Sequence, residues 1–470
     1  MRRSRSLITS SLAAMLALGL AACTQAAADA GPVAAGKTRV DVWLTESGLP
    51  GVLEPLFKQA EAFNKAHPDY QVVITPKNYL DMPRLVAEAA AKGEHPEVAQ
   101  LYYTDVQVGR DMKAAGGGPL FAPVQKATAG RKEILGEKVV NDELLPAARD
   151  YYSYGGELVS MPKNVSSTVM YSNSGILKRA GVSTPPATWS ELEAACAKIV
   201  KLPDAPTCVT WPNHGWFFEQ AIATQGGLWA DNDNGRSGRA RTTNLVSPEM
   251  LSWVTWWKGL YDKGYYLYTG FEEDYLGTSI NFAEGRTAFT LNSSEPAGFF
   301  VGAGEQFGGV EVSRMPVNEK VPYAGHMVGG DSLWLTAGLD KRTEDGALAF
   351  MNFLNSVPNT SAASASGGFL PVTTTAVTHL AGTGLYDRQP FLHVALDQLS
   401  DPRRFGPDAS AGTLPGPNGP LYGNFMKIEY VASAAMEDVL LRGADPHGRF
   451  TQANADAQLL LTSYNAQNQG

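Results

Sequence analysis

The spacing of apolar and polar residues predicts alternating strands and helices in the first quarter of the chain. Apolar side chains alternate with polar ones in a strand and recur every three or four residues on the buried face of a helix. Proline near the start and glycine after the end of an apolar repeat mark the boundaries of a helix. By these rules the chain begins with a strand over 39–44, a helix from Leu53 to the break at His67-Pro68, a strand over 70–74, a helix between Pro83 and Gly93, and a strand over 98–102. This order predicts a mostly parallel sheet covered by helices.

Helix-start signals recur further along the chain. Thr188-Trp189-Ser190-Glu191 has the pattern of a capping box, in which the threonine and the glutamate satisfy backbone N–H groups at the start of a helix. Ser247-Pro248 opens another helix that runs through Lys263, and Thr343 opens a third. No fixed-period repeat and no long low-complexity linker divides the sequence. We therefore expect two lobes that are connected by several crossings of the chain.

The first 22 residues have the pattern of an export signal. Arginines at positions 2, 3 and 5 precede an apolar stretch over 7–20, which is too short for a stable membrane anchor. Leu20-Ala21-Ala22-Cys23 resembles the bacterial lipobox, in which the cysteine is lipidated and becomes the first mature residue. An ordinary signal peptide cleaved near residues 26–28 is the alternative. Residues 23–37 are rich in alanine and glycine, which favours a flexible tether between Cys23 and the folded protein.

Composition limits the class of protein and its partners. The chain has 470 residues, of which 44% are hydrophobic and 18% charged, as is typical of a large globular protein with two or three domains. Its formal net charge of -9 argues against a nucleic-acid partner, which would require a basic face. Cys196 and Cys208 are twelve positions apart, and in an exported protein we expect them to form a disulfide.

The sequence contains no catalytic motif in the structural context that its chemistry requires. Gly31 to Thr38 matches the GxxxxGK[ST] pattern of a phosphate-binding loop, but a strand is predicted directly after it, where a helix is required. The seven histidines include no HExxH pair, and no serine lies in GxSxG. Glu272-Glu273-Asp274 is the densest acidic cluster, and we expect it to be a solvated loop. We therefore predict a protein that is not an enzyme and that carries neither a cofactor nor a metal.

Several segments, in order, resemble a known family. Met161 to Asn173, followed by Ala180-Gly181 and by Pro185 to Leu192, is similar to the signature of extracellular solute-binding proteins of ABC importers for carbohydrates. Within that family the resemblance is nearest to the glycerol-phosphate-binding branch. The other matching segments are Phe282 to Phe289, Gly329 to Trp334, Gly368 to Pro371, Asn78-Tyr79 and Tyr422-Gly423-Asn424.

The resemblance implies a two-lobed α/β fold of the type II periplasmic-binding-protein kind, with the ligand between the lobes. We expect residues 38–160 and 322–367 in the first lobe and residues 161–321 and 368–470 in the second. The implied partners are a small carbohydrate or polyol-phosphate ligand, the membrane subunits of an ABC permease, and the membrane itself through a lipid on Cys23. The protein would then be a monomer on the outer face of the bacterial cytoplasmic membrane.

The resemblance also implies a set of ligand-binding residues. Trp216 is the expected platform for a sugar ring, with a role in the core as the alternative. His214 lies where relatives can carry a second tryptophan. Trp253, Trp256 and Trp257 follow helical spacing and are expected to be core residues. Asp105 has a second interpretation as a helix N-cap, and Tyr79 has one as a surface tyrosine. The full set is Tyr79, Asp105, Ser166, Trp216, Ser294, Gly330, Phe369 and Leu421.

Two departures from the glycerol-phosphate-binding branch bear on the ligand. That branch carries an arginine where this chain has Leu421, and a tyrosine where it has Phe369. A buried phosphate monoester requires charge-assisted donors to offset its lost hydration. We therefore expect a neutral sugar or small oligosaccharide. Glycerol 3-phosphate or a glycerophosphodiester, with Lys163, Arg403 or Arg404 as its cationic partner, is the second hypothesis, and a secreted glycan-active enzyme is the third.

Overall fold

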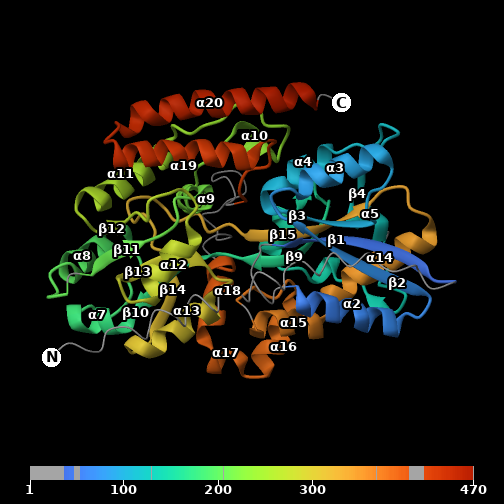
Figure 1. The fold of residues 1–470 in the computed structure, drawn as a ribbon, viewed down its shortest axis with the longest axis horizontal. Coiled ribbons are helices and arrows are strands. Elements are labelled where there is room, and N and C mark those ends of the chain that lie inside the picture. The colour runs from blue at the N-terminus through green and yellow to red at the C-terminus, as the bar shows by residue number, and fades with distance from the viewer. Residues whose placement is uncertain are drawn as a thin grey trace, which may run out of the picture.

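The computed structural model describes residues 36–46, 53–128, 130–204, 206–366, 368–401 and 418–468. Within these residues the chain forms two α/β lobes that lie side by side (Figure 1). The first lobe is built on a six-stranded sheet of order β2-β1-β3-β15-β4, with β9 pairing β15, and the second on a five-stranded sheet of order β12-β11-β13-β10-β14. The segment that predicts an export signal, Cys23, and the two arginines Arg403 and Arg404 lie outside the described residues.

The first sheet has a parallel core, as the sequence predicts. Its strand β1 (Thr38–Glu46) pairs in parallel with β2 (Tyr70–Asn78) on one side and with β3 (Val98–Tyr102) on the other. Because β1 begins at Thr38, a strand follows the glycine-rich segment there, and a phosphate-binding loop is excluded. The antiparallel members are β15 (Gly329–Thr336), β9 (Met161–Ser166) and β4 (Phe121–Ala122).

Helices cover the first sheet, and short hairpins extend the lobe. The predicted boundaries at Pro83 and Gly93 are close to the observed ends of α3, whose C-cap Gly93 has a φ of 73°. The helices are α2 (Glu54–Ala66), α3 (Met82–Lys92), α4 (Val106–Asp111), α5 (Val124–Thr128), α6 (Pro146–Tyr151), α14 (Lys341–Leu354) and α15 (Val357–Ser366), with the 3-10 turns η1 (Tyr103–Asp105) and η2 (Asn141–Glu143). The hairpins are β5 (Glu133–Ile134) with β6 (Glu137–Lys138), and β7 (Ser153–Tyr154) with β8 (Glu157–Leu158).

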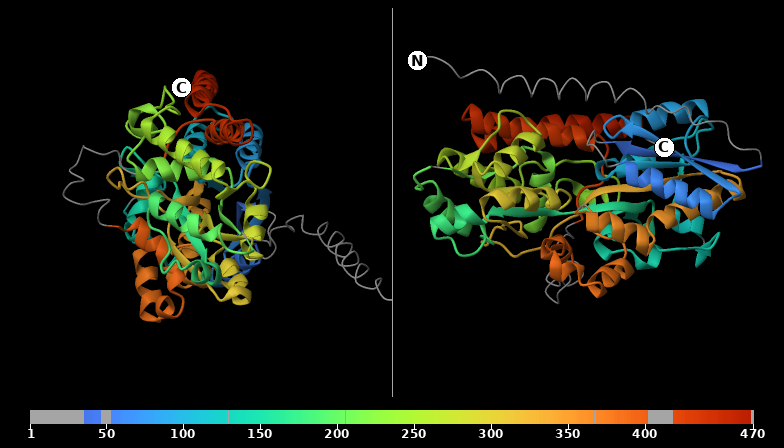
Figure 2. Two further views of the ribbon diagram at one scale, coloured as in Figure 1. Left: turned by 90° about the vertical axis from the view of Figure 1, so that its left-hand side faces the viewer. Right: turned by 60° about the horizontal axis from the view of Figure 1, so that its bottom comes forward.

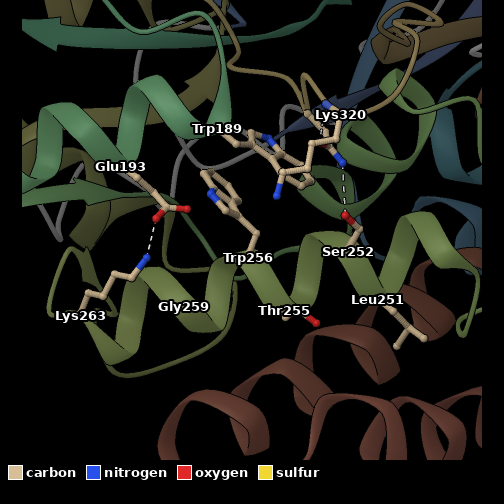
Figure 3. A pocket seen from close by; sticks show the side chains of 10 residues that line it. Trp189, Glu193, Leu251, Ser252, Thr255, Trp256, Gly259, Lys263 and Lys320 are labelled. Atoms are coloured by element: carbon tan, nitrogen blue, oxygen red, sulfur yellow. Dashed lines mark hydrogen bonds and ion pairs between the residues drawn. The ribbon is translucent and has the colours of Figure 1, made fainter.

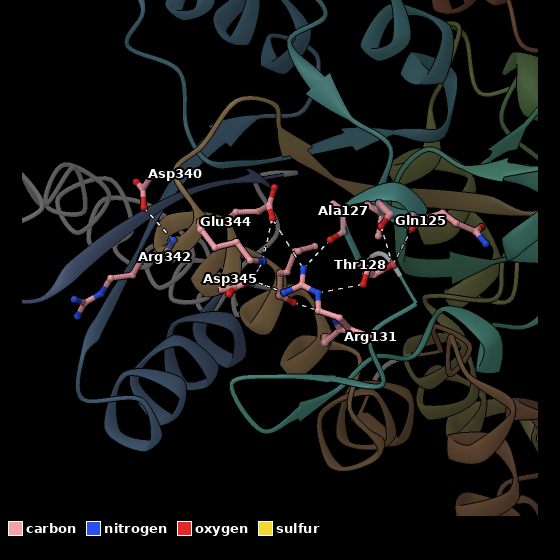
Figure 4. Close-up of polar contacts among 12 residues, drawn as sticks. Gln125, Ala127, Thr128, Arg131, Asp340, Arg342, Glu344 and Asp345 are labelled. Atoms are coloured by element: carbon pink, nitrogen blue, oxygen red, sulfur yellow. Dashed lines mark hydrogen bonds and ion pairs between the residues drawn. The ribbon is translucent and has the colours of Figure 1, made fainter.

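A polar junction joins α5 to α14, two helices far apart in the sequence. Figure 4 shows Arg131 reaching from the end of α5 toward the carboxylates of Glu344 and Asp345 on α14. Arg131 also donates hydrogen bonds to the carbonyl oxygens of Ala127 and Thr128, which the end of α5 leaves without helical partners. The junction therefore caps one helix while it fixes the position of the other.

The second sheet also combines a parallel core with antiparallel strands. The strand β11 (Thr207–Thr210) pairs in parallel with β12 (Tyr266–Leu267) and β13 (Thr287–Ser293). Antiparallel pairing adds β10 (Thr168–Asn173) to β13 and then β14 (Val310–Arg314) to β10. The helices of this lobe are α7 (Ser174–Ala180), α8 (Trp189–Ile199), α9 (Gly215–Thr224), α10 (Asp231–Gly235), α11 (Pro248–Asp262), α12 (Tyr275–Ala283), α13 (Ala297–Ala303), η3 (Gly304–Phe307), α19 (Phe425–Leu441) and α20 (Pro446–Gln467).

Local signals in this lobe have the expected structural roles. The Thr188 side chain accepts a hydrogen bond from the Glu191 N–H at the start of α8, and Ser247 caps α11 in the same way. Cys196 on α8 and Cys208 on β11 form a disulfide, with their Cα atoms 5.1 Å apart. Trp253 and Trp257 are fully buried, and the ring of Trp256 stacks on that of Trp189, so this tryptophan-rich helix is part of the core.

The chain passes between the lobes several times. It first leaves β9 of the first sheet and enters β10 of the second through Ser166-Ser167-Thr168. The expected boundary at residue 161 is therefore too early, because β9 pairs with β15 and extends the first sheet. The chain returns from β14 to β15, and a third connection runs through α16 (Thr374–Gly382), α17 (Leu385–Arg388), η4 (Pro390–Leu392) and α18 (Val394–Leu399).

Buried hydrogen bonds hold the first crossing in place. The Gln398 side chain on α18 donates to the Ser167 hydroxyl and to the Thr168 carbonyl oxygen, at 2.9 and 2.8 Å. The Ser167 hydroxyl in turn donates to the carbonyl oxygen of Met327, which lies just before β15. The two connections between the sheets are thus joined directly to each other. None of the helices in the described part of the chain combines the length and apolar character that a bilayer span requires.

Candidate functional site

The crossing strands provide one wall of the surface between the lobes. Ser166 ends β9 and is paired with Gly329 of β15. Gly330 has a φ of +123°, and a Cβ atom there would lie 1.9 Å from the Asn164 carbonyl oxygen, so this position requires glycine. At Gly329 a Cβ atom would come within 2.8 Å of the Trp216 ring. Because Gly329 and Gly330 have no side chains, Trp216 of the second lobe can pack directly on this strand of the first lobe.

Trp216 is held by the first turn of α9. His214 is the N-cap of this helix, and its Nδ1 accepts a hydrogen bond from the Trp216 backbone N–H at 3.0 Å. Burial lowers the pKa of His214 to about 4, so the imidazole is neutral at pH 7 and serves as the acceptor. The Trp216 side chain is 4% exposed, and its indole N–H has no hydrogen-bond partner among the described residues. It therefore offers an unused donor between the lobes.

Ser294 and Phe369 lie next to the same crossing. The Ser294 backbone N–H donates to the Ser167 carbonyl oxygen at 2.9 Å, and its hydroxyl accepts from the Ser167 N–H at 3.4 Å. Phe369 is half-buried and lies between Gly368, which packs on the backbone of Ser294, and Leu370, whose N–H donates to the Val165 carbonyl oxygen. Three distant segments of the sequence thus converge at the crossing, as the resemblance implies.

Tyrosines form the opposite wall on the first lobe. Tyr79 follows β2 and is half-buried, with its ring 5.8 Å from that of Tyr102, which is in turn 4.7 Å from that of Tyr103. Burial raises the pKa of Tyr79, and the carboxylates of Glu273 and Glu429 on the second lobe raise it further. Tyr79 is therefore a residue of the interlobe surface, near acidic groups of the other lobe.

Two buried glutamates of the second lobe meet this wall. The Tyr103 hydroxyl donates to Glu429 Oε1 on α19 at 3.1 Å, although the two residues are 326 positions apart in the sequence. Glu219 on α9 lies beside Glu429, and each of the two side chains is 1% exposed. Burial raises the pKa of both carboxyl groups, and for Glu429 the neighbouring Glu219 raises it further. At neutral pH the pair therefore retains a proton.

More acidic groups lie near the crossing. Burial raises the pKa of Glu295 to about 7, and the nearby Asp331 carboxylate adds to the shift. Burial also raises the pKa of Asp331 to about 6, although Asn164 donates a hydrogen bond to it at 2.9 Å. Lys163 is buried in the same region, where burial lowers its pKa and the charge of Asp331 opposes that change. This lysine thus already has an acidic neighbour within the protein.

Asp105 and Leu421 occupy buried positions with different roles. Asp105 ends η1 and precedes α4, but its side chain makes no capping hydrogen bond, and its Oδ2 atom has no partner among the described residues. Burial raises the pKa of Asp105 to about 7. The backbone N–H of Leu421 donates to the Asn234 carbonyl oxygen at 2.7 Å, and its apolar side chain is 2% exposed. Asp105 is therefore at the N-cap position of α4, but its side chain does not cap the helix.

A pH-dependent contribution of Asp105 to stability follows from its burial. A carboxyl whose pKa is raised in the folded state stabilises the protein at low pH and loses that contribution as the pH rises through about 7. We expect the free energy of unfolding of wild type, relative to Asp105→Asn, to fall by about 3–4 kcal/mol between about pH 4 and about pH 8. Denaturant unfolding of both proteins at the two pH values measures this change. A difference that is constant with pH would contradict it.

Polar contacts also join the lobes away from the crossing. Arg239, which follows α10, contacts the Asp111 carboxylate of α4 with both terminal nitrogens, at 2.9 and 2.5 Å. The Tyr464 hydroxyl of α20 donates to Asp111 at 2.9 Å, and Figure 2 shows α20 lying along one side of both lobes. Arg236 donates to the carbonyl oxygens of Asp150 and Tyr151 on the first lobe. These contacts hold the lobes in their observed relative positions.

We expect Arg239→Ala to weaken solute binding by roughly five-fold, or about 1 kcal/mol. The ion pair with Asp111 links the two lobes, so its loss favours arrangements in which they are separated. The control is Arg241→Ala, because Arg241 is exposed on the same segment and forms no ion pair among the described residues. Calorimetric titration of both variants and wild type with a solute that is known to bind measures the change in affinity. Equal losses in the two variants would show that Arg239 does not link the lobes energetically.

The structure also corrects the expectation for the acidic cluster at 272–274, and it adds site residues that were not predicted from the sequence. Glu273 is not part of a solvated loop: it is half-buried, and its Oε1 atom lies 3.4 Å from His214 Nε2. Burial raises the pKa of Glu273 to about 7. Glu219 carried a usable signal, because it interrupts the apolar run from Trp216 to Ile222, where an acid is costly unless it has a partner or a function. The missed residues are Tyr102, Tyr103, Glu219, Glu273, Tyr275, Glu295, Asp331 and Glu429.

A separate hollow lies on the second lobe, away from the crossing. It has a volume of about 520 Å³ and lies between α8 and α11, where Glu193 and Lys263 form an ion pair across its edge (Figure 3). The Trp256 ring on its wall stacks on Trp189, with ring centroids 4.6 Å apart, and is nearly parallel to the ring of Trp211 at 6.0 Å. This ring therefore contributes to the packing of the tryptophan cluster. The described residues include no group of three or more His, Cys, Asp or Glu side chains that could hold a metal ion.

Comparisons with known proteins agree with this geometry. The sn-glycerol-3-phosphate-binding periplasmic protein UgpB of Escherichia coli strain K12 is 26% identical over 440 residues, which is 91% of each chain. The solved cyclic α-maltosyl-1,6-maltose binding protein of Arthrobacter globiformis matches with a TM-score of 0.69 at 18% identity, and covers 91% of this chain and 100% of its own.

A second solved structure gives a similar result. UgpB of Mycobacterium tuberculosis in complex with glycerophosphocholine matches with a TM-score of 0.66 at 21% identity, over 91% of this chain and 99% of its own. The two structural matches support the two-lobed fold. The family model described as bacterial extracellular solute-binding protein matches residues 58–384, which is more than half of the chain. The chain therefore belongs to the bacterial extracellular solute-binding protein family.

Proposed function

We propose that the protein is the solute-binding component of an ABC importer and that it captures a sugar or small oligosaccharide between its lobes. The observation that carries the proposal is the surface where the lobes meet. It combines the indole of Trp216 and the rings of Tyr79 and Tyr102 with several buried carboxyl groups. Aromatic faces suit the C–H surfaces of a sugar, and carboxyl oxygens accept hydrogen bonds from its hydroxyl groups. Tyr79, Asp105, Ser166, Trp216, Ser294, Gly330, Phe369 and Leu421 remain the proposed ligand-binding set.

The charges at this surface favour a sugar over a phosphate monoester. A phosphate buried between the lobes would need charge-assisted donors, preferably from arginine. Leu421 is apolar, Lys163 is next to Asp331, and the surrounding carboxyl groups would repel an anion. Glycerol 3-phosphate or a glycerophosphodiester is the second candidate, because relatives named for glycerol-3-phosphate binding match 91% of the chain.

In the proposed mechanism the solute holds the two lobes together. A ligand that contacts both walls favours the arrangement in which they are close, and the permease would recognise that arrangement. The protein would deliver its solute as a monomer, and a separate ATPase would supply the energy for transport. Members of this family are solute-binding proteins, which supports a function in binding rather than in catalysis.

A thermal-shift screen of the purified mature protein tests this proposal. The panel contains mono- and oligosaccharides, glycerol 3-phosphate and glycerophosphocholine. A ligand that binds only the folded state raises the melting temperature, by an amount that increases with ligand concentration. A shift with a sugar supports the first candidate, and a shift with the phosphate compounds alone supports the second. Absence of a shift throughout the panel would contradict both.

We also propose that Cys23 is lipidated and tethers the protein to the outer face of the cytoplasmic membrane. The family description places its members outside the cytoplasm, and the lipobox-like segment 20–23 supplies the attachment point. We expect Cys23→Ala to be released in soluble form or to remain unprocessed, while solute binding by the folded part is unchanged. Fractionation of cells and mass spectrometry of the N-terminus distinguish these outcomes. A processed variant that stays on the membrane would contradict the proposal.

A further inference from the structure

The interlobe surface contains a compact group of acidic and aromatic side chains, which we call the acidic box. It has a buried end, at Glu219 and Glu429, and an end at Tyr79 and Glu273 that is half open to solvent. The Tyr275 ring lies on the same surface, 5.5 Å from that of His214, and the charges of Glu273, Glu429 and Glu219 all act on its hydroxyl. The acidic box consists of Glu219, Glu273 and Glu429 with Tyr79, Tyr102, Tyr103, Tyr275 and Tyr422.

Glu219 occupies a position in which an ionised carboxylate is costly, and the nearest polar groups are Glu429 and Tyr103. It is 1% exposed, and neither of its carboxyl oxygens has a geometrically satisfactory hydrogen-bond partner among the described residues. An unsatisfied buried acceptor typically costs about 1–3 kcal/mol, and a buried charge costs more. Gly215 contributes to this arrangement, because a Cβ atom there would lie 2.3 Å from Glu429 Cβ. The chain thus brings two buried carboxyl groups together, with the Tyr103 hydroxyl donating to Glu429.

Tyr422 gives an independent indication of a binding site for a polar ligand. It is 2% exposed, and its hydroxyl has no hydrogen-bond partner among the described residues. Burial raises the pKa of Tyr422, and Glu219 and Glu429 raise it further, so the hydroxyl is close to the glutamate pair. Buried polar groups in native proteins are normally hydrogen-bonded. A buried hydroxyl without a partner beside two buried carboxyl groups therefore points to a polar partner from outside the chain.

The described residues do not supply a positive charge to this box. No lysine or arginine among them forms an ion pair with Glu219, Glu429 or Glu273. Arg236 lies with its guanidinium 4.9 Å from the centre of the Tyr151 ring and bonds to backbone oxygens there. Lys163 lies near Asp331 instead. His214, whose Nε2 is 3.4 Å from Glu273 Oε1, is neutral at pH 7.

Tyrosine rings around carboxylates form a suitable site for an organic cation. A cation within about 6 Å of a tyrosine ring is attracted by its face, and a carboxylate adds a direct charge interaction. We propose that the solute carries a positively charged nitrogen, as in an amino sugar or a quaternary ammonium compound, and that the acidic box binds it. This inference rests on the proposed function, because it concerns a solute held between the lobes.

Binding of a cation at this site has a consequence for protons. The glutamate pair retains a proton at neutral pH because burial disfavours the charged form of both carboxyl groups, and for Glu429 the charge of Glu219 adds to this effect. A cation between the carboxyl groups favours their charged form and lowers their pKa, so a proton passes from the carboxyl group to the buffer as the solute binds. Affinity for a permanently charged solute should therefore rise from about pH 6 to about pH 8. A neutral solute should not show this increase.

The test compares pairs of probes that differ mainly in charge. Glucosamine is compared with N-acetylglucosamine, and choline with its uncharged isostere 3,3-dimethylbutan-1-ol, by calorimetry on the mature protein. We expect at least one cationic probe to bind ten-fold or more tightly than its neutral partner, and to release protons when titrated in buffers of different ionisation enthalpy. The first pair tests an amino sugar, and the second a quaternary ammonium compound.

Substitutions then test whether the preference for the cationic probe comes from the acidic box. Glu219→Gln keeps the shape of the side chain and removes its charge, so it should lose the preference for the cation while its unfolding stability stays the same or increases. Glu193→Gln, on the distant hollow, is the control and should keep the preference. The pair Arg403→Ala and Arg404→Ala tests whether residues outside the described part of the chain interact with the box. A preference that Glu219→Gln retains, or that these arginine variants create, would overturn the inference.

The outcomes separate this inference from the proposed function. If the cationic and neutral members of each pair bind equally, or if only an uncharged oligosaccharide such as maltotriose binds, the acidic box does not select a cation. The proposed function then stands and the inference fails. If none of these compounds and none of the wider screen binds, both fail.

Discussion

Replacing Trp216 with alanine is expected to weaken solute binding by roughly 30- to 1,000-fold, or about 2–4 kcal/mol. The indole is 4% exposed, packs on the side-chain-free backbone at Gly329, and has an unused N–H donor. Alanine would remove a large aromatic surface and that donor together. Calorimetric titration with the best solute from the screen measures the loss.

Two further variants test whether the loss of affinity comes from the indole ring of Trp216 itself. Trp216→Phe keeps an aromatic face but loses the indole N–H, so its affinity should lie between those of wild type and Trp216→Ala. Trp43→Ala is the control: Trp43 lies on β1 of the first lobe, and Lys77 packs over its ring at 4.6 Å, away from the crossing. Unchanged affinity in a folded Trp216→Ala protein would show that this tryptophan serves packing alone.

Removing the disulfide is expected to lower the free energy of unfolding by about 3 kcal/mol. Cys196 on α8 and Cys208 on β11 are both fully buried and close a loop with a sequence separation of 12. Without the bond, the unfolded chain gains conformational freedom that the folded lobe does not. Denaturant unfolding of the Cys196→Ala, Cys208→Ala double variant measures the effect, and alanine avoids leaving buried hydroxyl groups without partners.

The native protein with its disulfide reduced is the control for this second prediction. It should lose nearly the same stability as the double variant, while solute affinity in the folded state stays within about two-fold of wild type, because the bond lies within one lobe. Alkylation of the unreduced, denatured protein followed by mass spectrometry checks the bond directly. Two alkylated thiols would contradict it.

Local signals made much of the fold predictable. The strands over 39–44, 70–74 and 98–102 lie within β1, β2 and β3, and the capping residues Thr188 and Ser247 are where their helices begin. These features depend on neighbouring residues, so a short stretch of sequence contains the information. Thr343 was less informative: α14 begins two residues earlier, because Asp340 accepts hydrogen bonds from the N–H groups of Arg342 and Thr343.

The assignment of β9 depended on a distant strand. The sequence predicts strands near residue 161, but it does not say which sheet they join. β9 extends the first sheet because it pairs with β15, whose residues come more than 150 positions later. This pairing joins strands that meet only in the folded lobe, so neighbouring residues in the sequence do not specify it. The antiparallel strands β10 and β14 of the second sheet likewise pair with partners distant in the sequence.

Some features of the candidate site could likewise be predicted from the sequence, and others depend on the fold. The sequence by itself determined the positions that match the family, among them Ser166, Trp216 and Gly330, and it determined the disulfide partners. Only the tertiary structure decided that Tyr103 donates to Glu429, 326 positions away, and that Glu219 lies beside them. The physical reason is that a pKa and an unsatisfied hydrogen bond depend on burial and on charges brought together by folding. A glutamate in the sequence has neither property until the lobes surround it.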